Sequence, residues 1–187
     1  MLRVGGYRAC ALFQVYMMIY HSESEKIELL QRMPVFGGIR SDTLEFLLQR
    51  TGNVAVDSDG FFYHEGDPAN SLFVLLSGKV LLLKYWRGHN YVLKTQQRGN
   101  CFGEVALLDL MPRNTSAYVV ENSRAIELSS IDLHRLYEWD KEQFTLIQMN
   151  MAREVCRRLR EADERLFAAD IQMRKITSAP TRLTSAS

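Results

Sequence analysis

Between Val54 and Leu128, short apolar runs rich in Val, Phe, Tyr and Leu alternate with Gly, Asp, Asn and Ser. Runs of this length, interrupted this often, are typical of antiparallel strands in a sandwich or jelly roll. The tetrapeptide Arg87–Asn90 is expected to form the tip of a hairpin between two of them. We expect strands at residues 55–56, 61–63, 71–77, 79–86, 91–97, 101–102, 117–120 and 123–129.

Helical patterns flank this region on both sides. Ser24–Arg32 and Thr43–Arg50 predict two short helices before the strands, and Ser130–Tyr137 predicts another after them. A long helix is then expected over residues 141–173, which contain neither Gly nor Pro. The predicted fold class is therefore mainly β with flanking helices (α+β). It is an antiparallel β jelly-roll barrel, preceded by short helices and followed by a long C-terminal helix.

The long helix carries a narrow apolar stripe. Its members recur at alternating four- and three-residue steps over nearly three heptads: Val155, Leu159, Ala162, Leu166, Ala169 and Met173. This spacing is typical of two helices that bury a seam against each other. We favour a homodimer through Val155–Met173. The alternative is one helix that packs its stripe on its own barrel.

Composition narrows the classes of function. The chain has 187 residues, of which 47% are hydrophobic, and a formal net charge of +1, so it carries no strong electrostatic footprint for nucleic acid or membrane. Cys10, Cys101 and Cys156 lie far apart and the four histidines stand alone, so we expect no metal site and no cofactor. No nucleophile–base pair or carboxylate dyad is evident, so we expect no catalytic residue and no enzyme. Reduced thiols favour a cytoplasmic protein.

The stretch from Gly99 to Val119 concentrates the polar chemistry. Gly103 lets the backbone approach a ligand closely, and residues 105–108 predict a short helix whose N-terminal amides favour an anion. Arg113 offers a fork of donors that matches two phosphate oxygens, whereas an ionised Glu104 accepts hydrogen bonds from hydroxyls or amides. Together they suit a ligand with both a sugar hydroxyl and a phosphate. The alternative is a surface Arg–Glu pair that closes a loop.

Two motifs carry a family resemblance. The first is the run Phe102–Leu107, followed by Pro112 and Arg113. The second is Gly60–Val80, where glycines at 60, 66 and 78 are expected at hairpin turns, with Asp67 and Asn70 between them. The first looks like the phosphate-binding cassette, and the second resembles the barrel signature, of the cyclic nucleotide-binding domain family. That family includes the bacterial Crp/Fnr regulators, the regulatory subunits of cAMP-dependent protein kinase and cyclic-nucleotide-gated channels. The resemblance covers roughly Leu29 to Leu166.

The resemblance implies a ligand and the roles of its contacts. In the family the cassette Glu binds the ribose 2′-OH and the Arg binds the cyclic phosphate, which implies these roles for Glu104 and Arg113. The implied ligand is cAMP or cGMP. Thr115 stands where the family usually has Ala, so loss of nucleotide binding stays an open alternative. The other ligand-binding candidates in the cassette are Phe102, Gly103, Val105, Ala106, Asn114, Thr115 and Ser116.

The resemblance also implies that the long helix covers the purine base. The matching base-contact candidates are Ala162 and Asp163. The hydroxyl residues that bind adenine in the catabolite activator are missing here, whereas Asp163 offers an acceptor for the adenine amino group or for two guanine donors. The choice between cAMP and cGMP stays open, as does an Asp163 that is simply solvated.

The expected organisation is an N-terminal extension at 1–23, a domain at 24–140, the long helix at 141–173 and a disordered tail at 174–187. The apolar run Ala9–Tyr20 is too short to span a bilayer and lacks a signal-peptide cleavage pattern. It is either a docking segment for the domain or a partner, or translation starts at Met17 or Met18 and the residues before that start do not belong to the protein. The tail is too short for the helix-turn-helix that the Crp/Fnr resemblance would add, so we expect no direct DNA binding. We also expect no membrane association.

The expected function is that of a cyclic-nucleotide receptor in signal transduction, which acts through an unknown protein effector. Two alternatives stay open. One is a degenerate Crp/Fnr-like interaction module that keeps the barrel but binds no nucleotide. The other is a truncated transcriptional regulator.

Overall fold

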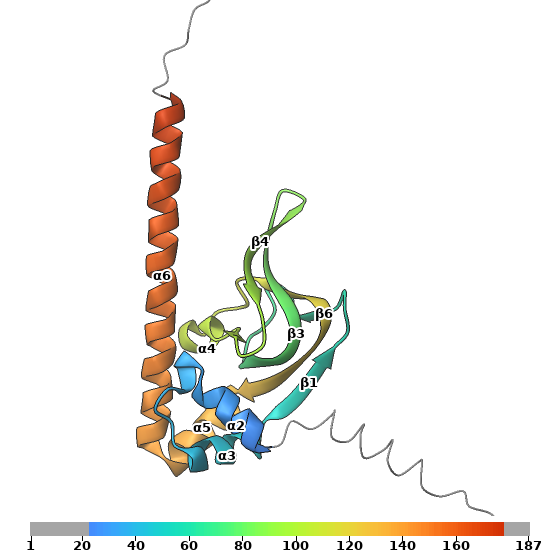
Figure 1. The fold of residues 1–187 in the computed structure, drawn as a ribbon, viewed down its shortest axis with the longest axis vertical. Helices are drawn as coiled ribbons and strands as arrows, with labels where there is room; N and C mark the ends of the chain where they lie inside the picture. The colour runs from blue at the N-terminus through green and yellow to red at the C-terminus, as the bar shows by residue number, and fades with distance from the viewer. Residues whose placement is uncertain (1–22, 178–187) are drawn as a thin grey trace, which may run out of the picture. The chain divides into compact units, whose positions relative to one another are not determined.

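The computed structural model describes residues 23–177. A strongly curved sheet forms the body of the domain, and α2, α3 and α5 lie together at one end of it (Figure 1). The helices are α2 (Glu23–Gln31), the 3-10 helix η1 (Pro34–Phe36), α3 (Ser41–Leu48), α4 (Val105–Asp109), α5 (Ser130–Trp139) and α6 (Lys141–Thr177). The strands are β1 (Gly52–Val56), β2 (Phe61–Tyr63), β3 (Ser71–Trp86), β4 (His89–Gln96), β5 (Cys101–Phe102) and β6 (Ser116–Ser129).

The chain divides into two compact units, with the boundary after Met151. The first unit contains the sheet, the short helices and the first turns of α6. The second is the remainder of α6 from Ala152. The helix continues to Thr177, so residues 174–177, which we predicted to be part of a disordered tail, are helical. The predictions for residues 1–22 and 178–187 lie outside the described residues.

The strands run antiparallel in the order β1-β6-β3-β4, with β2 added to β6 and β5 added to β3. This confirms the predicted antiparallel β fold with short helices before it and a long helix after it. The sheet does not close into a barrel within residues 23–177. The added strands β2 and β5 have only three and two residues, which leaves little backbone with which to close it.

Two of the predicted strand breaks are wrong. The strands expected at 71–77 and 79–86 form one strand, β3, and those expected at 117–120 and 123–129 form one strand, β6. Gly78, which we expected at a hairpin turn, lies inside β3 with φ of +90°. The pairing of β3 with β6 shifts register between Ser77 and Lys79. A glycine in this conformation makes a bulge that bends a strand without ending it.

Other turns can be compared with the prediction directly. The hairpin predicted at Arg87–Asn90 is confirmed, with Trp86 paired to His89 and positive φ at both loop residues, Arg87 and Gly88. Two positive φ values give the hairpin connection that matches strand twist. At the turn before β2, the left-handed residue is Asp59 rather than Gly60.

Two hydrophobic clusters stabilise the first unit. One packs the short helices and the start of α6 against one end of the sheet, and it includes Phe36, Leu44, Leu136 and Ile147. The other lies within the curve of the sheet and includes Tyr63, Phe73, Leu75, Phe102 and Val119. The second cluster places buried aromatic rings next to the predicted ligand site.

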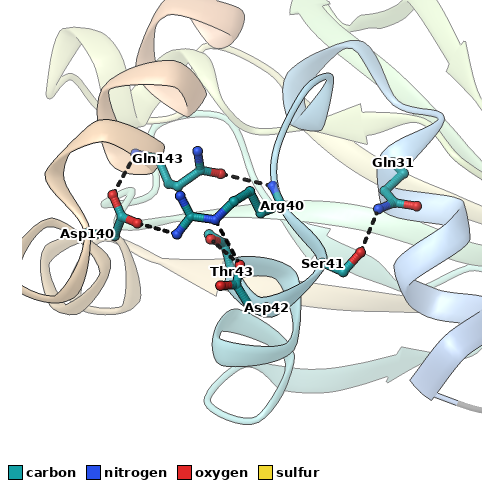
Figure 2. A network of polar contacts seen from close by, with 7 residues as sticks. All are labelled: Gln31, Arg40, Ser41, Asp42, Thr43, Asp140 and Gln143. Carbon is teal, nitrogen blue, oxygen red and sulfur yellow. Dashed lines mark hydrogen bonds and ion pairs between the residues drawn. The ribbon is translucent and has the colours of Figure 1, made fainter.

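A polar network ties the segment after η1 to the junction of α5 and α6 (Figure 2). Arg40 Nη2 donates to Asp140 Oδ2 at 2.6 Å, and the Arg40 amide donates to Gln143 Oε1 at 2.9 Å. The Gln143 amide in turn donates to Asp140 Oδ1 at 3.0 Å. The network therefore holds the N-terminal helices and the first turn of α6 together within the first unit.

This network gives stability an acid-sensitive component. The pKa of Asp140 is held below its usual value, first by the hydrogen bond from the Gln143 amide and then by the one from Arg40. Ionised Asp140 therefore stabilises the fold above about pH 4, the pKa of an unfolded Asp, and this contribution is lost as the pH falls through the folded value. We expect Asp140→Asn to lower the free energy of unfolding at pH 7, with a smaller difference from the native protein at pH 3. Urea unfolding at both values measures it.

The exposed Asp57 provides the control, because it takes no part in the network. Asp57→Asn should leave the free energy of unfolding nearly unchanged at both pH values. An Asp140→Asn effect of equal size at pH 3 and pH 7 would show that the charge of Asp140 is not what stabilises the fold.

Candidate functional site

A sharp turn after β5 presents Gly103 and Glu104. Phe102 is fully buried and pairs with Phe73 of β3, which anchors the turn in the aromatic cluster. Gly103 has φ of +81°, and a Cβ at this position would lie 2.5 Å from Arg113 Nη1. Only glycine fits here, because any other side chain would displace the arginine. Glu104 then occupies the N-cap position of α4, and its side chain is fully buried.

The backbone of Arg113 is fixed by the turn between β2 and β3. The Arg113 amide donates to the Asp67 carbonyl at 2.9 Å, and the Gly66 amide donates to the Arg113 carbonyl at 2.8 Å. The side chain reaches back to the start of the cassette, where Nη1 donates to the Gly103 carbonyl at 2.8 Å. Nη2 donates to Ser71 Oγ at 3.2 Å. The two ends of the cassette are therefore joined through this one guanidinium.

Arg113 is a buried charge, only 5% exposed. Burial lowers the pKa of the guanidinium, and the negative charges of Glu127, Asp67 and Glu104 act in the opposite direction. An arginine remains protonated even so. Within residues 23–177, the buried Nε has no hydrogen-bond partner. A buried cation with an unused donor is a favourable place for an anion, because an unsatisfied buried donor costs free energy.

The residues after Arg113 differ in their surroundings. Thr115 is buried and its side chain hydrogen-bonds the phenol of Tyr63. Asn114 is exposed, and its carbonyl accepts from Lys84 Nζ at 3.0 Å. Ser116 Oγ accepts from the Glu65 amide at 2.9 Å. Of these three candidates, Thr115 therefore lies in the same buried cluster as Arg113, whereas Asn114 and Ser116 bond Lys84 and Glu65 outside the cassette.

The remaining candidates fall into two groups. Val105 and Ala106 form the first turn of α4, with Ala106 buried and Val105 partly exposed. Ala162 and Asp163 belong to the second compact unit, where both are exposed on α6. Their contact with a base stays a prediction.

Sequence reasoning missed two members of the site. Tyr63 and Ser71 both contact the guanidinium of Arg113, Tyr63 through its ring face and Ser71 through its hydroxyl. Both belong to the Gly60–Val80 motif, in which we predicted turns but no ligand contact. The sequence did contain one signal. Tyr63 directly precedes the turn at residues 64–67, and this turn bonds the backbone of Arg113.

Access to the site depends on movement. Glu104 and Arg113 are 0% and 5% exposed, so a ligand reaches them only if neighbouring segments rearrange. Leu110 and Met111, between α4 and Arg113, are 84% and 60% exposed. A separate cavity of about 600 Å³ does not include Glu104 or Arg113. It is lined by Phe61, His64, Glu65, Gly66, Tyr85, Asn90 and Ser116.

Two other kinds of site are absent from residues 23–177, the described part of the chain. No group of three or more His, Cys, Asp or Glu side chains is arranged to hold a metal ion there. No helix in it is both long and apolar enough to cross a membrane.

Residues 54–140 match the family described as "Cyclic nucleotide-binding domain". A cyclic AMP receptor protein of Thermus thermophilus is 30% identical over 131 residues, which cover 70% of this chain and 59% of the relative. A CRP-like cAMP-activated global transcriptional regulator of Mycobacterium tuberculosis is 27% identical over 140 residues, 74% of this chain and 61% of the relative. The chain thus spans about three fifths of the length of these relatives.

A solved structure with the same kind of fold comes from one of the same organisms. The crystal structure of the Thermus thermophilus catabolite activator protein superposes with a TM-score of 0.65 at 29% sequence identity. The superposition covers 73% of this chain and 63% of that one.

Proposed function

Because residues 54–140 belong to the cyclic nucleotide-binding domain family, we propose that this protein binds cAMP or cGMP at the cassette and signals through a protein partner. Arg113 would hold the cyclic phosphate, and Glu104 would accept a hydrogen bond from the ribose 2′-OH. The names of the two relatives above refer to cAMP. Asp163 keeps cGMP in the proposal, because its carboxylate suits the two donors of guanine.

The state of Arg113 carries this proposal. Its guanidinium is buried with an unused Nε donor, beside a turn where only glycine fits. Burying a charge is costly, and perturbed charged groups of this kind cluster at functional sites. An anion that meets this donor gains a charge-assisted hydrogen bond.

A thermal-shift assay tests the proposal. With cAMP or cGMP at a hundred times its dissociation constant, mass action stabilises the folded state by about 2.7 kcal/mol, so the melting temperature should rise. Linear 5′-AMP and 5′-GMP are the control ligands, because they lack the ring-closed diester. We expect the cyclic forms to act at lower concentration than the linear ones.

One observation favours the degenerate module as a second candidate. Arg113 is bonded within the chain to Gly103 and Ser71, and Thr115 is bonded to Tyr63, so the cassette is closed on itself. If none of the four nucleotides raises the melting temperature at millimolar concentration, this candidate replaces the receptor. The domain would then act only as an interaction module.

We also propose that the protein is a homodimer through α6. In the second unit, the stripe residues Leu159, Leu166 and Met173 are 60% to 69% exposed. Exposed apolar residues at this spacing are stabilised when a second helix covers them.

The dimer prediction has a matched pair of variants. Leu166 lies in the stripe and Phe167 lies beside it, and both are 69% exposed. We expect Leu166→Glu to give a monomer in light scattering at micromolar concentration, because it places charges in the seam. Phe167→Glu should remain a dimer. A native protein that is monomeric with and without nucleotide would contradict the dimer.

A further inference from the structure

The guanidinium of Arg113 lies on an aromatic floor. Its central carbon is 4.2 Å from the ring centroid of Tyr63 and 5.6 Å from that of Phe73. Tyr63 and Phe73 stack with centroids 5.9 Å apart, and Phe102 lies 6.2 Å from Tyr63. All three rings are buried. The ring under Arg113 is therefore fixed by its neighbours before any ligand arrives.

The hydroxyl of Tyr63 is fixed as well. Tyr63 ends β2, where it pairs with Ala117 of β6, and Thr115 precedes that strand. The Thr115 side chain hydrogen-bonds the phenol. Burial raises the pKa of Tyr63 to about 12, so the ring stays neutral at physiological pH. Ring, hydroxyl and Arg113 thus form one connected set.

Resting on the proposed function, we propose that Tyr63 and Thr115 are positioning residues that hold the Arg113 guanidinium in the plane and at the depth where it meets the phosphate. A free arginine side chain samples many rotamers, and a ligand must otherwise order it on binding. The Tyr63 face attracts the cation and fixes its plane, while Gly103 and Ser71 occupy Nη1 and Nη2. On this account Thr115 supports the site, although the family usually has Ala at this position.

The test compares calorimetric affinities of three tyrosine variants for whichever cyclic nucleotide the native protein binds more tightly. Tyr63→Leu removes the ring face and should weaken binding about tenfold. Tyr63→Phe keeps the ring, loses the bond to Thr115 and should weaken binding about two- to threefold. Tyr118→Phe is the matched control, because Tyr118 is only partly buried and its hydroxyl bonds Asp59 rather than a residue of the cassette, and it should bind like the native protein.

A second readout separates positioning from stability. The Rp and Sp phosphorothioates of the nucleotide differ only in which exocyclic phosphate oxygen is replaced by sulfur. A guanidinium that has moved changes the ratio of the two affinities, whereas general destabilisation weakens both equally. We expect the Rp/Sp ratio to change at least threefold in Tyr63→Leu and to stay constant in Tyr118→Phe.

The outcomes are distinguishable from failure of the proposed function. If the native protein binds no cyclic nucleotide, the proposed function fails. If it binds and Tyr63→Leu binds with native affinity and Rp/Sp ratio, the positioning inference alone is overturned. If Tyr63→Leu does not fold, the affinities of Thr115→Val and of the double variant Thr115→Val/Tyr63→Phe test the positioning inference instead. The double variant should bind no more weakly than Tyr63→Phe, and additive losses would overturn the coupling.

Discussion

Arg113→Ala is expected to weaken cyclic-nucleotide binding by about 2–5 kcal/mol, which is roughly 30-fold to several thousand-fold in affinity. The substitution leaves the phosphate charge without its cation in a buried site. The two hydrogen bonds to Gly103 and Ser71 disappear with it, so the ends of the cassette are no longer joined. Isothermal titration calorimetry with cAMP and cGMP measures the loss.

Arg98→Ala is the control for this prediction. Arg98 is exposed, so its removal changes the net charge by the same amount without touching the cassette. Its affinity should stay within about twofold of the native value, because exposed charges act weakly through salt solution. Equal affinities of the Arg113→Ala and native proteins would remove the role we assign to Arg113.

Gly78→Ala should lower the free energy of unfolding by about 3 kcal/mol or more. A Cβ at this position would lie 2.2 Å from Ser123 Oγ, 2.6 Å from the Asn122 carbonyl oxygen and 2.7 Å from Ser123 Cα. Two of these contacts are with the backbone of β6, which cannot turn aside as a side chain can. Urea unfolding followed by circular dichroism measures the change.

Gly88→Ala is the control that separates the cost of the steric clash from the cost of a positive φ at a residue with a side chain. Gly88 has φ of +87°, almost the same as the +90° of Gly78, but its Cβ would meet nothing within 4 Å. This control should therefore lose only the conformational cost, about 1–2 kcal/mol. If both variants lose the same free energy, the bulge in β3 does not depend on close contact with β6.

The placement of strands was predictable where turns are local. The Arg87-Gly88 hairpin depends only on residues next to it, so its sequence was sufficient. The continuity of β3 through Gly78 was not predictable, because it depends on the pairing with Ser123 and its neighbours, 45 residues later in the chain. A glycine that bends a strand and a glycine that ends one look alike in a single sequence.

The candidate site shows the same division. Glu104 and Arg113 were found because their types and spacing carry chemistry. Tyr63 and Ser71 were missed because their importance comes from the fold, which brings β2 and the start of β3 to the cassette. The orientation of Arg113 toward the Gly103 carbonyl was equally beyond the sequence, since it requires the left-handed turn at Gly103.

A crystal structure of the protein with saturating cAMP or cGMP tests the central claim most directly. We expect a nucleotide with its cyclic phosphate within hydrogen-bond distance of the Arg113 guanidinium and its ribose 2′-OH within hydrogen-bond distance of the Glu104 carboxylate. A structure at saturating ligand in which the nucleotide is absent or bound away from these two side chains would contradict the account.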